Sequence, residues 1–177
     1  IAKGHRHLSG IQTEAKNNQN ALDEMTKAEQ AAQNIQDERL KNEMLAGVHY
    51  GLSVLNLSSR NYDEALTNLD KSERLRISVG DFSRTVKIYS LKGKIAEAKG
   101  DLSLAKDCYR EGLEEAKKVG RTDEIIRNHL GLSRIYERET SKDKSKKHLS
   151  EAQLLLKTTP IPYRIDEKEI RLQNLNN

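Results

Sequence analysis

The sequence predicts an all-α protein, a solenoid of about four stacked helix pairs that is followed by a C-terminal helix. The 177-residue chain contains only two prolines, both after residue 159, so helices can extend through almost all of it. Hydrophobic residues make up 35% and charged residues 33% of the composition. This balance suits an elongated array in which each unit buries one stripe of side chains and exposes the rest.

A further observation is an internal repeat, in which residues of similar type recur at intervals of 40 positions. The rows are Ala65, Ala105 and Ser145, then Leu69, Tyr109 and Leu149, then Ala32, Ser72, Gly112 and Ala152. Agreement at several independent rows indicates a structural repeat. The predicted solenoid covers residues 1–157, with repeats at about residues 5–40, 41–80, 81–120 and 121–157.

The third repeat indicates most clearly how each unit forms two helices. A helix over residues 83–99 is expected, with Ser83 as its N-cap and Gly100 in the turn that follows. A second helix over residues 102–119 is expected to end at Gly120, because the left-handed residue after a helix is most often glycine. The two helices of this unit are therefore predicted to be joined by a short turn.

Small residues mark where the helices of a pair are expected to cross closely. Ala105 and Gly112 lie on the face of the second helix that meets the first helix, and Gly93 lies on the first helix. A side chain that extended beyond Cβ would push the two helix axes apart at such a crossing. We therefore expect Gly93 and Gly112 to be buried in tight contacts.

The ends of the array are less regular than its middle. The first repeat is expected to turn at residues 17–20, which are three asparagines and a glutamine. The turn of the fourth repeat, residues 140–143, lacks glycine. Pro160 and Pro162 predict an extended start to residues 158–177, followed by a short capping helix. The alternative interpretation of this extension is a linker to another domain, and the start at Ile1 suggests a fragment or a processed product.

The pattern resembles the tetratricopeptide repeat, over roughly residues 5–157. In the third repeat the matching residues are Gly93, Gly100, Asp101, Ala105, Tyr109 and Gly112. In the second they are Leu52, Ser53, Tyr62, Ala65 and Leu69, and in the fourth Leu132, Ser133, Tyr136, Leu149 and Ala152. The usual period of that family is about 34 residues, so these 40-residue repeats are a long variant. The resemblance implies a right-handed solenoid whose first helices line a concave, peptide-binding groove.

Carried over by this resemblance, the groove positions combine an apolar section with a basic strip. The groove residues are Tyr50, Val54, Leu57, Lys87, Lys94, Glu97, Arg127, Leu130, Arg134 and Arg138. The basic strip suits an acidic or C-terminal peptide, because Arg and Lys hold carboxylates through charge-assisted hydrogen bonds. The alternative is that these side chains only solvate helix faces.

Patterns that would indicate an enzyme are missing from the sequence. There is no glycine-rich phosphate loop, and His5 and His7 would point to different faces of a helix, so neither a cofactor nor a metal is expected. His49 and His129 occupy equivalent repeat positions, which favours a packing role for both. Cys108 is the single cysteine, so it forms no intrachain disulfide and is expected to be a small buried residue. We expect no catalytic residues.

The most favoured function is therefore a protein–protein interaction scaffold. One alternative is a ligand- or partner-sensing regulatory module of a larger signalling or transcription-regulator protein. Another is nucleic-acid binding through residues 117–147, which hold ten basic and five acidic residues, although Tyr136 is their only aromatic side chain. No apolar run approaches the ~20 residues of a membrane span, and a cytoplasmic location is expected.

Overall fold

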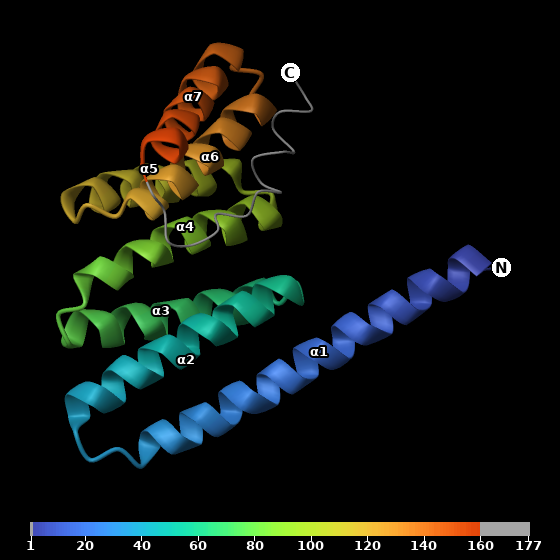
Figure 1. Ribbon diagram of the computed structural model, residues 1–177, viewed down its shortest axis with the longest axis vertical. Coiled ribbons are helices and arrows are strands. Elements are labelled where there is room, and N and C mark those ends of the chain that lie inside the picture. The colour runs from blue at the N-terminus through green and yellow to red at the C-terminus, as the bar shows by residue number, and fades with distance from the viewer. Residues whose placement is uncertain (1, 160–177) are drawn as a thin grey trace. The chain divides into compact units, whose positions relative to one another are not determined.

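The computed structural model describes residues 2–159, with side chains from residue 17 onward. Within this range it contains seven α-helices and no strand, which confirms the predicted all-α class (Figure 1). The helices are α1 (Ala2–Gln33), α2 (Glu38–Ser58), α3 (Tyr62–Ser78), α4 (Phe82–Lys99), α5 (Leu102–Lys118), α6 (Thr122–Arg138) and α7 (Lys142–Thr158). The predicted capping helix lies outside the described residues.

The chain divides into two compact units, Ile1–Gly80 and Asp81–Asn177, which we describe separately. In the N-terminal unit α1 packs on α2 and α2 on α3. In the C-terminal unit α4 pairs with α5 and α6 with α7, while α6 also packs against both α4 and α5. The division falls at residue 80, where one predicted repeat ends and the next begins.

The backbone from α3 to α7 follows a regular interval of 20 residues. These five helices begin at Tyr62, Phe82, Leu102, Thr122 and Lys142. A residue of positive φ precedes each one by two positions: Arg60 (62°), Gly80 (74°), Gly100 (86°), Gly120 (69°) and Thr140 (59°). The predicted left-handed conformation of Gly120 is thus confirmed. Arg60 and Thr140 adopt the same turn without glycine, at a cost of about 1–2 kcal/mol each.

Three of the helices have an aspartate N-cap, whose carboxylate accepts a hydrogen bond from a backbone N–H group in the first turn. Asp81 accepts from Arg84 N at 3.2 Å, and Asp101 accepts from Leu104 N at 3.0 Å. The prediction that Ser83 is the N-cap of α4 is wrong, because the N-cap is Asp81, two residues earlier, whose carboxylate accepts from Arg84 N. Asp37 caps α2 in the same way, with its carboxylate 3.0 Å from Leu40 N.

Helix α1 runs without interruption through residues 17–20, so the turn predicted there is wrong. Asparagine and glutamine permit turns but do not stop a helix in the way that proline does. The side chain of Gln19 donates a hydrogen bond of 3.0 Å to Asp23, one helical turn further on. The first predicted repeat is consequently a single long helix and not a helix pair.

The core of the C-terminal unit is organised around Tyr109 of α5, whose side chain is fully buried. A Cβ atom added to Gly93 of α4 or to Gly131 of α6 would lie 2.6 Å from Cε1 of this ring. The ring therefore lies between two helices that can come this close only because both carry glycine there. Gly112 is equally tight, since its Cβ would lie 2.6 Å from Oδ1 of Asn128 and 2.8 Å from Cβ of Tyr89. The close crossings predicted at Gly93 and Gly112 are confirmed.

Candidate functional site

Helices α4 and α6 pack side by side in the C-terminal unit and carry the basic residues of the predicted groove. We use the name α4–α6 face for the charged side chains Lys87, Lys94, Glu97, Glu124, Arg127, Arg134 and Arg138. Five are basic and two are acidic, so the face keeps an excess of three positive charges. Ion pairs to Glu97 connect the two helices at one end of the face, and a hydrogen bond from Ser90 to Glu124 connects them at the other.

Glu97 is the centre of the first group of charges. Nη2 of Arg134 lies 3.1 Å from Oε2 of Glu97, and its Nε lies 3.2 and 3.3 Å from the two carboxylate oxygens. Nη2 of Arg138 lies 3.4 Å from Oε1 of the same carboxylate. Only 10% of the Glu97 side chain is exposed, so two arginines neutralise one nearly buried anion.

Tyr109 joins this group from the core side. Its hydroxyl donates a hydrogen bond of 3.0 Å to Oε2 of Glu97 and accepts one of 3.3 Å from Nη2 of Arg134. Burial raises the pKa of Tyr109 far above its ordinary value, so the phenol remains a neutral donor. The same residue thereby fills the helix crossing and orients the carboxylate on the α4–α6 face.

Glu124 is the centre of the second group, and its side chain is almost completely buried. The hydroxyl of Ser90 donates a hydrogen bond of 2.8 Å to its Oε2. Nε of Arg127 lies 3.5 Å from its Oε1. Burial raises the pKa of Glu124 above the ordinary range, although Ser90 and Arg127 both act against this shift.

These contacts change the interpretation of the basic strip. Arg127, Arg134 and Arg138 each have a carboxylate partner, so the strip is not a row of uncompensated cations. Arg138 remains the most accessible of the three, with 52% of its side chain exposed. Leu130 differs from expectation, because it is fully buried against Leu149 and Ala152 of α7 and has no surface on this face.

The apolar section of the predicted groove lies on α2, in the N-terminal unit. Tyr50 and Leu57 are half-buried there, and Val54 is 40% exposed. The three positions follow the i, i+4, i+7 spacing of one helix face. They belong to a different compact unit from the α4–α6 face, and we describe them on their own.

A pair of histidines that the sequence analysis did not connect lies between α6 and α7. Nδ1 of His129 is 2.9 Å from Nδ1 of His148, and the ring centroids are 5.1 Å apart. His49 and His129 are both 8% exposed, which confirms the predicted packing of these equivalent positions. The signal for the pair was the repeat itself, since Asn68 and His148 are 80 residues apart, or two repeats, as His49 and His129 are, and face those histidines.

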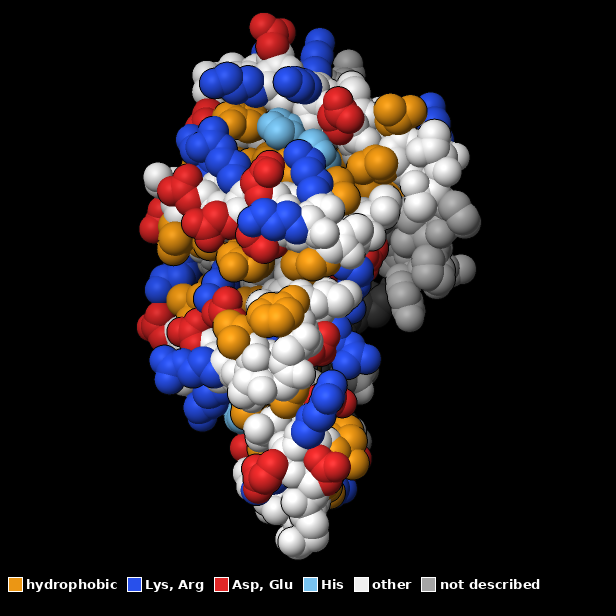
Figure 2. All heavy atoms as spheres, turned by 90° about the vertical axis from the view of Figure 1, so that its left-hand side faces the viewer, with side chains coloured by type: hydrophobic (Ala, Val, Ile, Leu, Met, Phe, Trp, Pro, Cys, Tyr) orange, Lys and Arg blue, Asp and Glu red, His pale blue; other side chains and the backbone are white. Residues whose placement is uncertain are grey.

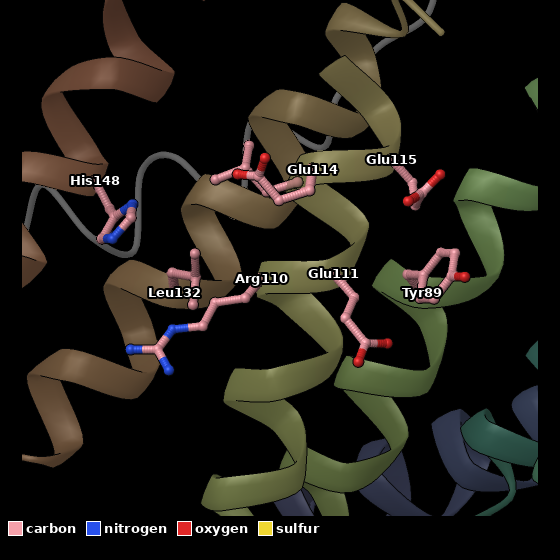
Figure 3. Close-up of a pocket in the computed structure, with 8 residues that line it drawn as sticks. Tyr89, Arg110, Glu111, Glu114, Glu115, Leu132 and His148 are labelled. Atoms are coloured by element: carbon pink, nitrogen blue, oxygen red, sulfur yellow. The ribbon is translucent and has the colours of Figure 1, made fainter. Parts of the chain in front are cut away.

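His148 also lines a cavity of about 480 Å³ that surrounds part of α5 (Figure 3). The lining residues are Tyr89, Arg110, Glu111, Leu113, Glu114, Glu115, Leu132 and His148. Figure 3 shows Arg110 and His148 on one side of α5 and Tyr89 and Glu111 on the other. Arg110 donates a hydrogen bond of 2.7 Å to the hydroxyl of Tyr136, which ties it to α6.

Outside these clusters the surface is mixed in charge. On the face shown in Figure 2, basic and acidic side chains are interspersed and do not separate into patches of one sign. On α5, pairs three residues apart combine opposite charges, with Lys117 3.5 Å from Glu114 and Lys118 2.5 Å from Glu115. Such exposed pairs stabilise a helix only slightly, because solvent screens the two charges from each other.

The described residues also include metal-ligating types of side chain and one thiol. No group of three or more His, Cys, Asp or Glu side chains there is arranged to hold a metal ion, and the side chains of His5 and His7 lie outside this range. Cys108 is half-buried, and burial raises the pKa of its thiol, which keeps it protonated. No described helix combines the length and the apolar character that crossing a membrane requires.

The fold defines an all-α protein whose described helices from α3 onward recur every 20 residues. No family model matches the chain, and no curated protein matches it. The repeat and the surfaces described above are therefore the features that bear on its function.

Proposed function

We propose that this chain is a protein–protein interaction scaffold, a right-handed solenoid of tetratricopeptide-like helix pairs that binds a peptide or protein partner. The observation that carries the proposal is the regular 20-residue interval of helix starts and left-handed turns from α3 to α7. Equivalent helices that recur at a constant interval present equivalent faces, which is how repeat arrays build extended binding surfaces. We further propose that it has no catalytic activity and acts in the cytoplasm.

The partner that best suits the α4–α6 face carries a carboxylate. Arg134 is held by three contacts to Glu97, whereas Arg138 makes one contact of 3.4 Å and is half exposed. Arg138 can therefore turn toward an incoming anion while Arg134 continues to neutralise Glu97. Hydrogen bonds that involve charged groups contribute about 1.5–3 kcal/mol each. Lys87 and Lys94, both half-buried, add positive charge on the α4 side.

The test uses peptides in place of an unknown partner. An array of acidic peptides with free C-termini, each paired with its C-terminally amidated form, is probed with the purified chain. We expect binding to selected free-carboxylate peptides, and a loss of tenfold or more in the double variant Lys94→Glu, Arg138→Glu. The double variant Lys142→Glu, Lys157→Glu changes charge equally on exposed residues of α7 and is the matched control. Equal binding by all three proteins would contradict the proposed face.

Arg134 is a poor choice for this test, although it belongs to the same strip. Its reversal would leave the nearly buried Glu97 beside a second negative charge and would destabilise the unit. Reversal of Lys94 and Arg138 should perturb Glu97 less, because Arg134 keeps its three contacts with this carboxylate and Arg138 is half exposed. Far-UV circular dichroism of each variant verifies that helicity is unchanged.

A regulatory module of a larger signalling or transcription-regulator protein is an alternative that uses the same binding property. Nucleic-acid binding is less favoured, because Tyr136 is not available as a stacking platform. Its ring is stacked on His148 at 5.4 Å, with the ammonium groups of Lys106 and Lys144 5.9 and 5.5 Å from its centroid. Salt-dependent binding to a random oligonucleotide would favour this alternative over the peptide scaffold.

A further inference from the structure

The contact between His129 and His148 requires a particular protonation state. A hydrogen bond between two imidazole nitrogens needs one N–H donor and one lone pair. At 2.9 Å, the two Nδ1 atoms satisfy this only if at least one of them is unprotonated. When both rings are cationic, two N–H groups and two positive charges face each other at the same distance.

The surroundings act against protonation of either ring. Burial lowers the pKa of His129 to about 4, with smaller contributions from His148 and Lys117 in the same direction. Burial, followed by Lys147 and Arg110, lowers the pKa of His148 as well, and the carboxylate of Glu151 opposes this. The facing groups come from every packed element: Arg110, Glu114 and Lys117 from α5, Tyr136 from α6, and Lys147 and Glu151 from α7.

We propose that the His129–His148 pair is a pH-sensitive latch that holds α7 against α6. Acidification protonates both rings, replaces their hydrogen bond by repulsion and releases α7. Protons reach His148 through the cavity that it lines, because its ring is only half-buried. The surface that becomes exposed is apolar, since Ile126 and Leu130 of α6 are fully buried under Leu149 and Ala152 of α7.

The N-terminal unit contains the equivalent pair with an asparagine in place of the second histidine. His49 Nδ1 lies 3.1 Å from Oδ1 of Asn68, at the same separation of 19 residues. An amide oxygen accepts a hydrogen bond from neutral or cationic imidazole alike. Glu29 Oε1, 3.9 Å from Nε2 of His49, places a carboxylate beside any added proton. The latch therefore belongs to the α6–α7 pair, and Asn68 indicates the substitution that should remove it.

The experiment is hydrogen–deuterium exchange on the full 177-residue chain at pH 7 and pH 5, with each rate divided by its intrinsic rate at that pH. We expect the opening of α7 to increase by roughly tenfold or more at pH 5, because each histidine takes up its proton more readily when released. The opening of α2 and α3 should change much less. In His148→Asn, which reproduces the His49–Asn68 pair, the pH dependence of α7 should be lost.

Two outcomes would overturn the latch: an opening of α7 that is equal at the two pH values, or a pH dependence that persists in His148→Asn. His49→Gln is the matched control, and its α7 should respond to pH as in the unmodified chain. If His148→Asn does not fold, an NMR titration of the histidines in the unmodified chain still decides the matter. Ordinary pKa values near 6.5 for both His129 and His148 would then reject the proposal.

Discussion

The ring of Tyr109 lies between two glycines of neighbouring helices, and its hydroxyl donates a hydrogen bond of 3.0 Å to the carboxylate of Glu97. One side chain on α5 thus connects the core of the C-terminal unit with the charged α4–α6 face. Packing and surface electrostatics are coupled at this residue, so a change in either should be measurable in the other.

The first prediction concerns the crossing of α4 and α5. Gly93→Ala should lower the free energy of unfolding by about 1–3 kcal/mol, because the new methyl group would lie 2.6 Å from the ring of Tyr109. The ring of Tyr109 cannot shift away from the new methyl group, because Gly131 of α6 is equally close to it. Urea denaturation followed by circular dichroism measures the change.

Gly47 provides the control for this substitution, because it lies within α2, is exposed, and has no atom within 4 Å of an added Cβ. Gly47→Ala should raise the free energy of unfolding by about 0.5–1 kcal/mol through helix propensity alone. A similar rise in Gly93→Ala would show that the crossing is not tight.

The second prediction separates the two arginines that bind Glu97. Arg134→Met should lower the free energy of unfolding by roughly 3 kcal/mol, because a nearly buried carboxylate loses its principal partner. Arg138→Met should cost less than about 1 kcal/mol, since Arg138 is half exposed and its contact is long. Equal costs, measured by urea denaturation, would contradict the central position of Arg134.

The third prediction concerns the phenol of Tyr109. Tyr109→Phe retains the ring and removes the donor, and it should cost about 1–2 kcal/mol because Glu97 keeps its charge but loses one hydrogen bond. In Glu97→Gln the same substitution should cost less, since a neutral acceptor binds the phenol more weakly. A double-mutant cycle with a coupling free energy near zero would show that the contact contributes nothing.

The fourth prediction is a pH dependence at Glu124. Its pKa is raised in the folded state, so the ionised carboxylate destabilises the fold at pH 7 and this cost diminishes as the pH falls through the folded pKa. Glu124→Gln retains an acceptor for Ser90 and removes the charge. The variant should be the more stable protein at pH 7, and its advantage should shrink as the pH approaches 4. An advantage that grows toward acid pH would contradict a raised pKa of Glu124 in the folded state.

Much of the helical framework could be predicted from local patterns. Gly100 and Gly120 end α4 and α5 because their left-handed conformation is available to glycine at little cost. The small residues of the repeat predicted the close crossings. At Gly93 and Gly112 the neighbouring helix lies so close that an added Cβ would overlap its atoms. Two predictions from local propensity were wrong. Helix α1 continues through residues 17–20, where a turn was predicted, and the N-cap of α4 is Asp81 in place of Ser83.

By itself, the sequence determined the all-α class, the repeat interval and the positions where helices must approach closely, because these depend on backbone conformation and side-chain volume along one chain. Tertiary structure alone decided which charges meet. Glu97 and Arg134 are 37 residues apart, and His129 and His148 belong to different helices. Whether a basic residue is available to a partner or already neutralised depends on distances between helices, and only the packed structure sets those distances.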